Sequence, residues 1–289
     1  MLPNVSRDLR LILLILLMSN FSLAHIDPWM GLDQIENELK AKPEDVSLLI
    51  DKTHVLIRMG RLDEAKVTLQ RVDQLEKEKS ADSTFTYIFF YQKSGDDKKA
   101  FELSNWGIKQ FPDNYYQWNI RAVIAMKTGR VSEAIEALSK CLSIDPKGNL
   151  YNYVFLADTL MKRDKKGDKE KALAVVKQGI ANFTNAIEAS QLLHLSITIN
   201  TELKHFDDAI KNIESLETLF GKRIPYAVKR AEILELAGRQ QAIIDAYDEV
   251  ISMLNALPEQ KQNTQTDKMR ASYMQKRASL HTNSSEHKP

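Results

Sequence analysis

Residues 81–114 read ADSTFTYIFFYQKSGDDKKAFELSNWGIKQFPDN, and residues 115–148 read YYQWNIRAVIAMKTGRVSEAIEALSKCLSIDPKG. A fixed 34-residue frame fits both stretches without a gap. Such a period indicates one two-helix unit repeated along the chain. The pair therefore predicts an all-α repeat protein and directs the functional question to a partner. The matching glycine, alanine and proline positions are Gly95, Ala100 and Pro112, then Gly129, Ala134 and Pro146.

The second stretch carries the signals of two helices joined by a tight turn. Trp118, Ala122 and Met126 follow helical spacing, and then Gly129 breaks the pattern. Glycine best tolerates the left-handed backbone conformation that often ends a helix. Ser132 can cap a second helix, which Pro146 stops because proline cannot continue a helix.

These residues resemble the tetratricopeptide repeat (TPR) family. The family prefers an aromatic residue at the fourth position, small residues at the eighth, twentieth and twenty-seventh, and proline at the thirty-second. The matching residues are Trp118, Ala122, Ala134, Cys141 and Pro146. The resemblance implies a right-handed superhelical solenoid of about six helical hairpins with helical caps. Looser copies of the frame occupy 46–80, 149–185, 186–223 and 224–257.

The ends of the chain suggest a different organisation. Residues 1–24 combine Arg7 and Arg10 with the apolar run 11–18 and a small-residue exit at Ala24, which is typical of a cleaved secretory signal peptide. An uncleaved anchor is the alternative. We expect a capping segment at 25–45, repeats at 46–257, a capping helix at 258–280 and a disordered tail at 281–289. The unit 149–185 also carries about three extra residues in a charged turn at 163–169.

Charge and cysteine content restrict the partners. The chain has 40 basic and 39 acidic side chains, and removal of Arg7, Asp8 and Arg10 with the signal leaves 38 of each. A neutral chain without a basic stripe argues against nucleic acid. We expect no stable membrane insertion after signal cleavage, and a monomer because the terminal helix is polar. Cys141, the single cysteine, excludes an internal disulfide and is expected to be buried.

The sequence holds no cluster typical of catalysis. It lacks the CxxC and HExxH zinc patterns, the glycine-rich nucleotide loops and the GxSxG elbow. We therefore expect no enzyme activity, no cofactor and no metal site. The alternative is a copper-binding protein or enzyme in which His25 becomes the amino terminus after cleavage.

The TPR resemblance also implies a concave groove lined by the first helix of each hairpin. Its second, fifth, ninth and twelfth positions would face a partner. Ile50 and His54 in the first unit, and two phenylalanines in the second, stand where a carboxylate clamp would need Lys and Asn, so we reject that clamp. Each aromatic ring could instead pack between repeats. The predicted groove residues are Phe85, Phe89, Gln92, Tyr116, Asn119, Val123, Tyr151 and Asp158.

These features together predict a non-catalytic scaffold or adaptor outside the cytoplasm. Its partner would be another protein or peptide, held in the groove as an extended segment or a helix. A periplasmic location is expected, with secretion as the alternative, and envelope assembly or export is the suggested task by analogy of fold.

Overall fold

The computed structural model describes residues 28–285. Within these residues the chain forms fourteen α-helices and one short 3-10 helix, and no strand. The prediction of an all-α repeat fold is thus confirmed. The predicted signal peptide and His25 lie outside the described residues. The chain divides into two compact units, the first ending at Arg163 and the second beginning at Asp164.

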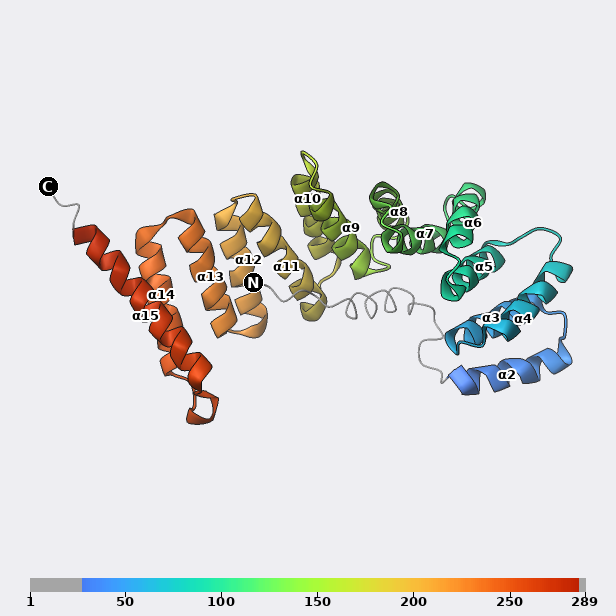
Figure 1. Cartoon of the computed structure of the whole chain (residues 1–289), viewed down its shortest axis with the longest axis horizontal. Helices are drawn as coiled ribbons and strands as arrows, with labels where there is room; N and C mark the ends of the chain where they lie inside the picture. Colours follow the sequence, from blue (N-terminus) through green and yellow to red (C-terminus); the bar gives the residue numbers. More distant parts are fainter. Residues whose placement is uncertain (1–27, 286–289) are drawn as a thin grey trace. The chain divides into compact units, whose positions relative to one another are not determined.

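In the first unit each helix packs on the next one along the chain (Figure 1). In addition, α3 packs on α5 and α5 packs on α7, so alternate helices form one layer. The layer brings together residues about 30 positions apart in the sequence. The helices are α2 (Pro28–Ala41), α3 (Val46–Arg58), α4 (Leu62–Leu75), α5 (Ala81–Ser94), α6 (Asp97–Gln110), α7 (Tyr115–Lys127), α8 (Val131–Ile144) and α9 (Leu150–Arg163).

Local signals explain where these helices begin and end. Ser80 caps α5 by accepting a hydrogen bond from the Ser83 backbone N–H at 3.1 Å. Gly95 ends the same helix at φ 84°, a left-handed conformation that costs glycine no side-chain clash. Ala100 and Ala134 are fully buried, which lets paired helices approach closely. Cys141 is buried as expected, and burial raises the pKa of its thiol to about 12, which makes it unreactive.

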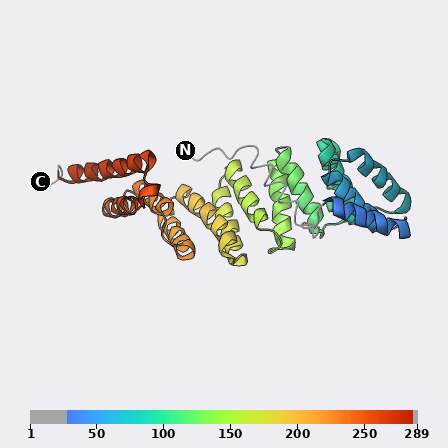
Figure 2. The ribbon, with the colours of Figure 1, turned by 90° about the horizontal axis from the view of Figure 1, so that it is seen from below.

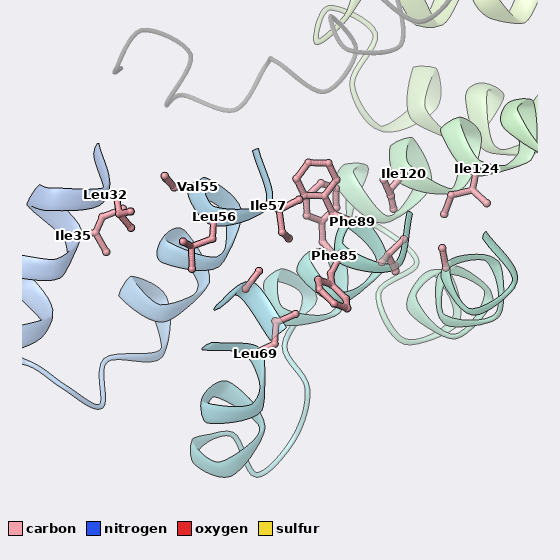
Figure 3. Packing of buried hydrophobic residues seen from close by; sticks show 14 residues of the cluster. Leu32, Ile35, Val55, Leu56, Ile57, Leu69, Phe85, Phe89, Ile120 and Ile124 are labelled. Atoms are coloured by element: carbon pink, nitrogen blue, oxygen red, sulfur yellow. The ribbon is translucent and has the colours of Figure 1, made fainter. Parts of the chain in front are cut away.

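Beside a smaller cluster of Leu49, Ile50 and Val72, the first unit has one large core cluster. Leu56 of α3, Leu69 of α4 and Ile88 of α5 are almost completely buried in it. Figure 3 draws side chains of this cluster from α2, α3, α4, α5 and α7, among them Phe85 and Phe89. Burial of this kind stabilises a repeat stack at roughly 25 cal/mol per Å² of apolar surface.

The second unit continues the pattern of helical hairpins, seen from another side in Figure 2. Its last helix covers the preceding hairpin. Tyr273 of this helix is buried, and its ring centroid lies 5.4 Å from that of Tyr247. This helix runs to Ser285, five residues past the expected end of the cap, because no glycine or proline interrupts 264–285. The helices are α10 (Asp168–Asn182), α11 (Ala186–Glu202), α12 (Phe206–Phe220), α13 (Ile224–Ala237), α14 (Gln240–Asn255), η1 (Glu259–Lys261) and α15 (Thr264–Ser285).

Candidate binding face

The predicted groove residues all lie in the first unit, on α5, α7 and α9. We call the groove positions on α3, α5 and α7 the candidate face. It comprises His54 of α3, Phe85, Phe89 and Gln92 of α5, and Tyr116, Asn119 and Val123 of α7. Phe85, Phe89, Asn119 and Val123 are buried, whereas the ring of Tyr116 is 41% exposed. Gln92 of α5, and Tyr151 and Asp158 of α9, are half-buried. The prediction therefore combines buried rings with polar groups that solvent can reach.

Aromatic rings connect the three helices of the candidate face. The His54 ring of α3 lies 5.7 Å from the Phe85 ring and 6.0 Å from the Phe89 ring, both on α5. Phe85 in turn meets Tyr116 of α7 edge to face at 6.3 Å. Such tilted arrangements are the favoured geometry of aromatic pairs. The row gives the face a rigid apolar floor.

Phe85 and Phe89 belong mainly to the core. Only 9% and 7% of their surfaces are exposed, and both residues belong to the buried cluster drawn in Figure 3. Their main role is therefore packing between repeats, which was the alternative for each ring. Tyr116, at the edge of the row, presents more surface than either phenylalanine.

Two amide side chains on the face have unused hydrogen-bonding groups. Asn119 is only 8% exposed, and its side chain makes no hydrogen bond with the described residues. The Oε1 atom of Gln92 is buried and also has no hydrogen-bond partner in the described part of the chain. A buried polar group without a partner costs about 1–3 kcal/mol. Gln92 Oε1 is therefore a buried acceptor left open, whereas the Asn119 amide atoms keep some contact with solvent.

His54 stays neutral at physiological pH. Its Nε2 lies 2.6 Å from the Thr86 hydroxyl, which donates its own proton to the Asp82 backbone carbonyl at 2.7 Å. Nε2 must therefore carry the imidazole proton. Burial, aided by the Arg58 charge, lowers the pKa of His54 to about 4. The residue thus serves as a neutral ring and hydrogen-bond donor on the face.

The two α9 residues lie at a different place from the aromatic row. The Tyr151 ring packs on Phe155 with 6.2 Å between centroids, and Asp158 forms an ion pair with Lys162. Phe155 and Asp158 line a largely apolar hollow of about 290 Å³, together with Met126 of α7. Because Asp158 already has a cationic partner, it is less available to a ligand than the unpaired amides.

Sequence reasoning missed Asp51. This half-buried residue of α3 lines a cavity of about 240 Å³ beside the aromatic row. A usable signal was present in the sequence. Asp51 has Ser47, Leu48, His54 and Val55 at its helical neighbour positions, so no lysine or arginine can pair with it locally.

The residues that the structure describes contain neither a group arranged to hold a metal ion nor a helix able to span a membrane. No group of three or more His, Cys, Asp or Glu side chains among residues 28–285 is arranged to hold a metal ion. No helix in this range is both long and apolar enough to cross a membrane.

Comparisons with known proteins agree with this architecture. A family model described as tetratricopeptide repeat matches residues 118–147, the repeat with the strongest sequence signals. No match was found among curated proteins.

Solved structures share the fold. A chain of the structure of Naa15/Naa10 bound to HypK-THB has a TM-score of 0.52 and 19% identity over 93% of this chain, which spans only 39% of that one. PilF of Pseudomonas aeruginosa has a TM-score of 0.50 and 11% identity, covering 84% of this chain and 99% of its own. A tetratricopeptide repeat protein from Parabacteroides merdae reaches 0.46 at 15% identity, over 86% and 93% of the two chains. Because the sequence identities to the Naa15/Naa10 chain and to PilF are only 19% and 11%, these two similarities show a shared fold.

Proposed function

We propose that this chain, whose residues 118–147 match a tetratricopeptide repeat model, is a non-catalytic scaffold that holds an extended segment of a partner protein on the candidate face. The observation that carries the proposal is Asn119. The residue is only 8% exposed and lies one helical turn from the exposed Tyr116, and its amide atoms reach solvent without a hydrogen-bond partner in the described residues. A site that orders a peptide needs such fixed polar groups next to apolar anchors.

An extended segment suits the face better than a helix. The free groups of Asn119 and Gln92 are amide donors and acceptors. A helix satisfies its own backbone hydrogen bonds, apart from its ends. An extended chain instead offers backbone N–H and C=O groups to side-chain amides. Tyr116 would contact an apolar side chain of the same segment.

We also propose that the protein acts outside the cytoplasm, in the periplasm, where it would assist envelope assembly or export. The support is the basic, apolar and small-residue order of residues 1–24. The test is the intact mass of the protein recovered from its native cell fraction. A mass that corresponds to a chain beginning at His25, found outside the cytoplasm, is expected. A full-length chain in the cytoplasm would contradict the proposal.

Binding is tested by capture with two matched baits. The chain and its Tyr116→Ala/Asn119→Leu variant are exposed to an envelope extract, and each captured protein is then purified and its affinity measured directly. Phe89→Ala is unsuitable, because truncation of a buried phenylalanine costs about 3–5 kcal/mol and would disturb folding. The expected result is a partner bound by the chain and lost by the variant.

A control variant separates the face from the rest of the surface. Val67→Ala/Asn105→Leu makes the same kinds of change on α4 and α6, where Val67 is exposed and Asn105 half-buried. This control should bind the partner as the chain does. Equal binding by all three proteins would exclude the candidate face.

A further inference from the structure

A second feature of the first unit is a polar cavity that adjoins the aromatic row. It has a volume of about 240 Å³ and lies between α3 and the segment that leads from α4 into α5. Pockets that hold drug-sized molecules are larger, about 300–1,000 Å³. This cavity therefore has the size for a single side chain. Its polar lining residues are Ser47, Asp51, His54, Glu76, Ser80 and Asp82.

The cavity carries three carboxylates and no cationic side chain. Asp51 forms no ion pair or hydrogen bond with the described residues. Glu76 accepts a hydrogen bond from the Ser80 hydroxyl at 2.8 Å through Oε1, but its Oε2 is buried without a partner in the described chain. The Asp82 carboxylate likewise makes no ion pair there. A buried acceptor that lacks a donor is costly unless a ligand supplies one.

Nearby lysines are engaged elsewhere. Lys52 pairs with Glu36 at 2.8 Å, and Lys79 pairs with Asp73 at 2.6 Å. Burial raises the pKa of Asp51, and the negative charges of Asp82, Asp45 and Glu38 raise it further. Negative charge is thus concentrated at the cavity, where no cationic side chain is among the lining residues; the Arg58 charge is near enough to lower the pKa of His54 but does not line the cavity. A cation entering the cavity would relieve this repulsion.

The geometry favours an organic cation over a metal ion. No metal-binding group of three or more ligands occurs within residues 28–285. The cavity also has an apolar side, formed in part by Phe85, which belongs to the aromatic row as well. A lysine or arginine side chain has an apolar stem that can lie along such a surface while its charged end meets carboxylates.

We propose that this cavity takes a lysine or arginine side chain of the extended segment bound on the candidate face, so that the partner is selected by a basic residue at one fixed position. This inference rests on the proposed function. The inference adds the chemistry of the partner to that proposed function: the partner carries a basic side chain next to an apolar one. The three carboxylates lining the cavity would bind the cationic end, and the Tyr116 region would hold the apolar neighbour.

The test is a selection of random peptides displayed on phage, with the full chain as target. Two variants are used in parallel: Asp51→Asn/Glu76→Gln at the cavity and Asp63→Asn/Glu136→Gln as a control. Asp63 and Glu136 are exposed and lie on α4 and α8 of the same unit. The expected result is that peptides selected by the chain and by the control share a lysine or arginine at one position. The cavity variant should lose this preference and keep the apolar one.

A selected peptide then allows a quantitative test by fluorescence anisotropy. Replacement of its basic residue by glutamine should weaken binding to the chain by about tenfold or more, because a charge-assisted pair is lost. The same replacement should change binding to the cavity variant by less than about twofold, as expected when the two groups are directly coupled. Thermal unfolding should show that the cavity variant is at least as stable as the chain, since Asp51→Asn removes uncompensated charge.

The outcomes separate the two proposals. Peptides without any basic preference, or equal losses in the chain and the cavity variant, would overturn this inference and leave the proposed function intact. If neither the chain nor the control selects any peptide, the proposed function fails and this inference fails with it.

Discussion

The polar side chains on the candidate face of the first unit differ from those on α13 of the second unit, although α11 of the second unit also carries an unpaired buried acceptor, Asn200 Oδ1. In the first unit, Asn119, Asp51 and the Oε1 atom of Gln92 have no hydrogen-bond or ion-pair partner in the described residues. In the second unit, the groups at the corresponding positions of α13 are paired. Glu232 binds Lys229 at 3.1 Å, and Glu235 accepts from Tyr247 at 2.7 Å and from Lys276 at 2.8 Å.

A second contrast concerns half-buried charge. Arg230 of α13 donates to Glu249 of α14 at 2.6 Å and pairs with Glu217 of α12, so that one guanidinium links three helices. The cavity of the first unit has two half-buried carboxylates, Asp51 and Glu76, and no such cation. Unpaired polar groups reduce stability, and natural proteins accept such local violations mainly at functional sites. The comparison shows that α13 uses its charged groups to join neighbouring helices, whereas the carboxylates at the cavity of the first unit have no such cation.

The largest effect is expected for Arg230→Met. The three side chains of this network are 13–24% exposed, and removal of the cation leaves two carboxylates facing each other. We expect a loss of about 3 kcal/mol, since removal of one partner of a buried pair costs about 3–5 kcal/mol. Hydrogen exchange should show the loss of protection in α12–α14, with less change in α5 and α7. Lys229→Met, which breaks an exposed pair, should cost less than about 0.5 kcal/mol. A similar small loss for Arg230→Met would contradict the proposed contrast.

The next effect is a pH dependence that differs between the units. Burial lowers the pKa of His54 to about 4, from an ordinary value of 6.5. Below pH 6.5 the unfolded chain gains a proton at this site and the folded chain does not, so stability falls as the pH drops from 6.5 towards 4. The contribution of His54 is up to about 3 kcal/mol, given about 1.4 kcal/mol per pKa unit.

His54→Gln should remove most of this pH-dependent loss. The measurement is urea unfolding at several pH values between 4 and 7. Burial also lowers the pKa of His194 in the second unit, but this side chain is exposed, so His194→Gln should change the slope less. Parallel pH profiles for the chain and His54→Gln would show that the histidine does not stay neutral.

Asn119→Leu should separate binding from stability. An apolar residue of similar size removes an unpaired amide, so thermal stability should stay unchanged or rise. Affinity for the partner should fall by about tenfold, which corresponds to one or two lost hydrogen bonds. Asn212→Leu in the second unit is the matched comparison, because the half-buried Asn212 donates to Ser196 at 2.7 Å. That variant should lose about 1 kcal/mol of stability and bind normally. A destabilised Asn119→Leu would indicate a structural role.

The smallest effect concerns a turn of the second unit. Lys204 has φ 61°, the left-handed conformation that Gly95 has in the first unit. A non-glycine residue pays about 1 kcal/mol there, partly offset by the greater freedom of glycine when unfolded. Lys204→Gly should therefore stabilise the protein by roughly 0.5 kcal/mol in thermal unfolding. Lys211→Gly, within α12, should destabilise it by about 1 kcal/mol. Destabilisation by both changes would show that the turn is not strained.

Much of the fold could be predicted from local patterns. Gly95 and Gly129 both follow helices in the left-handed conformation, at the turn positions that the frame assigned to them. The extra charged residues at 163–169 coincide with the division between the two units. These features depend on backbone conformation and helix spacing, which residues close in sequence decide.

The candidate site was less predictable, because burial depends on neighbours about 30 residues away. Phe85 and Phe89 stand at groove positions, but contacts with α3 place them mainly in the core. Asp51 drew no attention in the sequence, since its importance comes from Glu76 and Asp82 across the cavity. Helical spacing alone cannot distinguish a half-buried ring from an exposed one.

The sequence by itself determined the repeat frame, the all-α fold and the positions of the tight turns, because these follow from helix periodicity and from the backbone limits of glycine and proline. The tertiary structure alone decided which polar groups remain without partners. Pairing requires two side chains to meet across helices, so it depends on how α3, α5 and α7 pack together. In the second unit the packing of α12, α13 and α14 joins Arg230 to two carboxylates. In the first unit the packing of α3, α5 and α7 leaves Asn119 and Asp51 unpaired within the described chain.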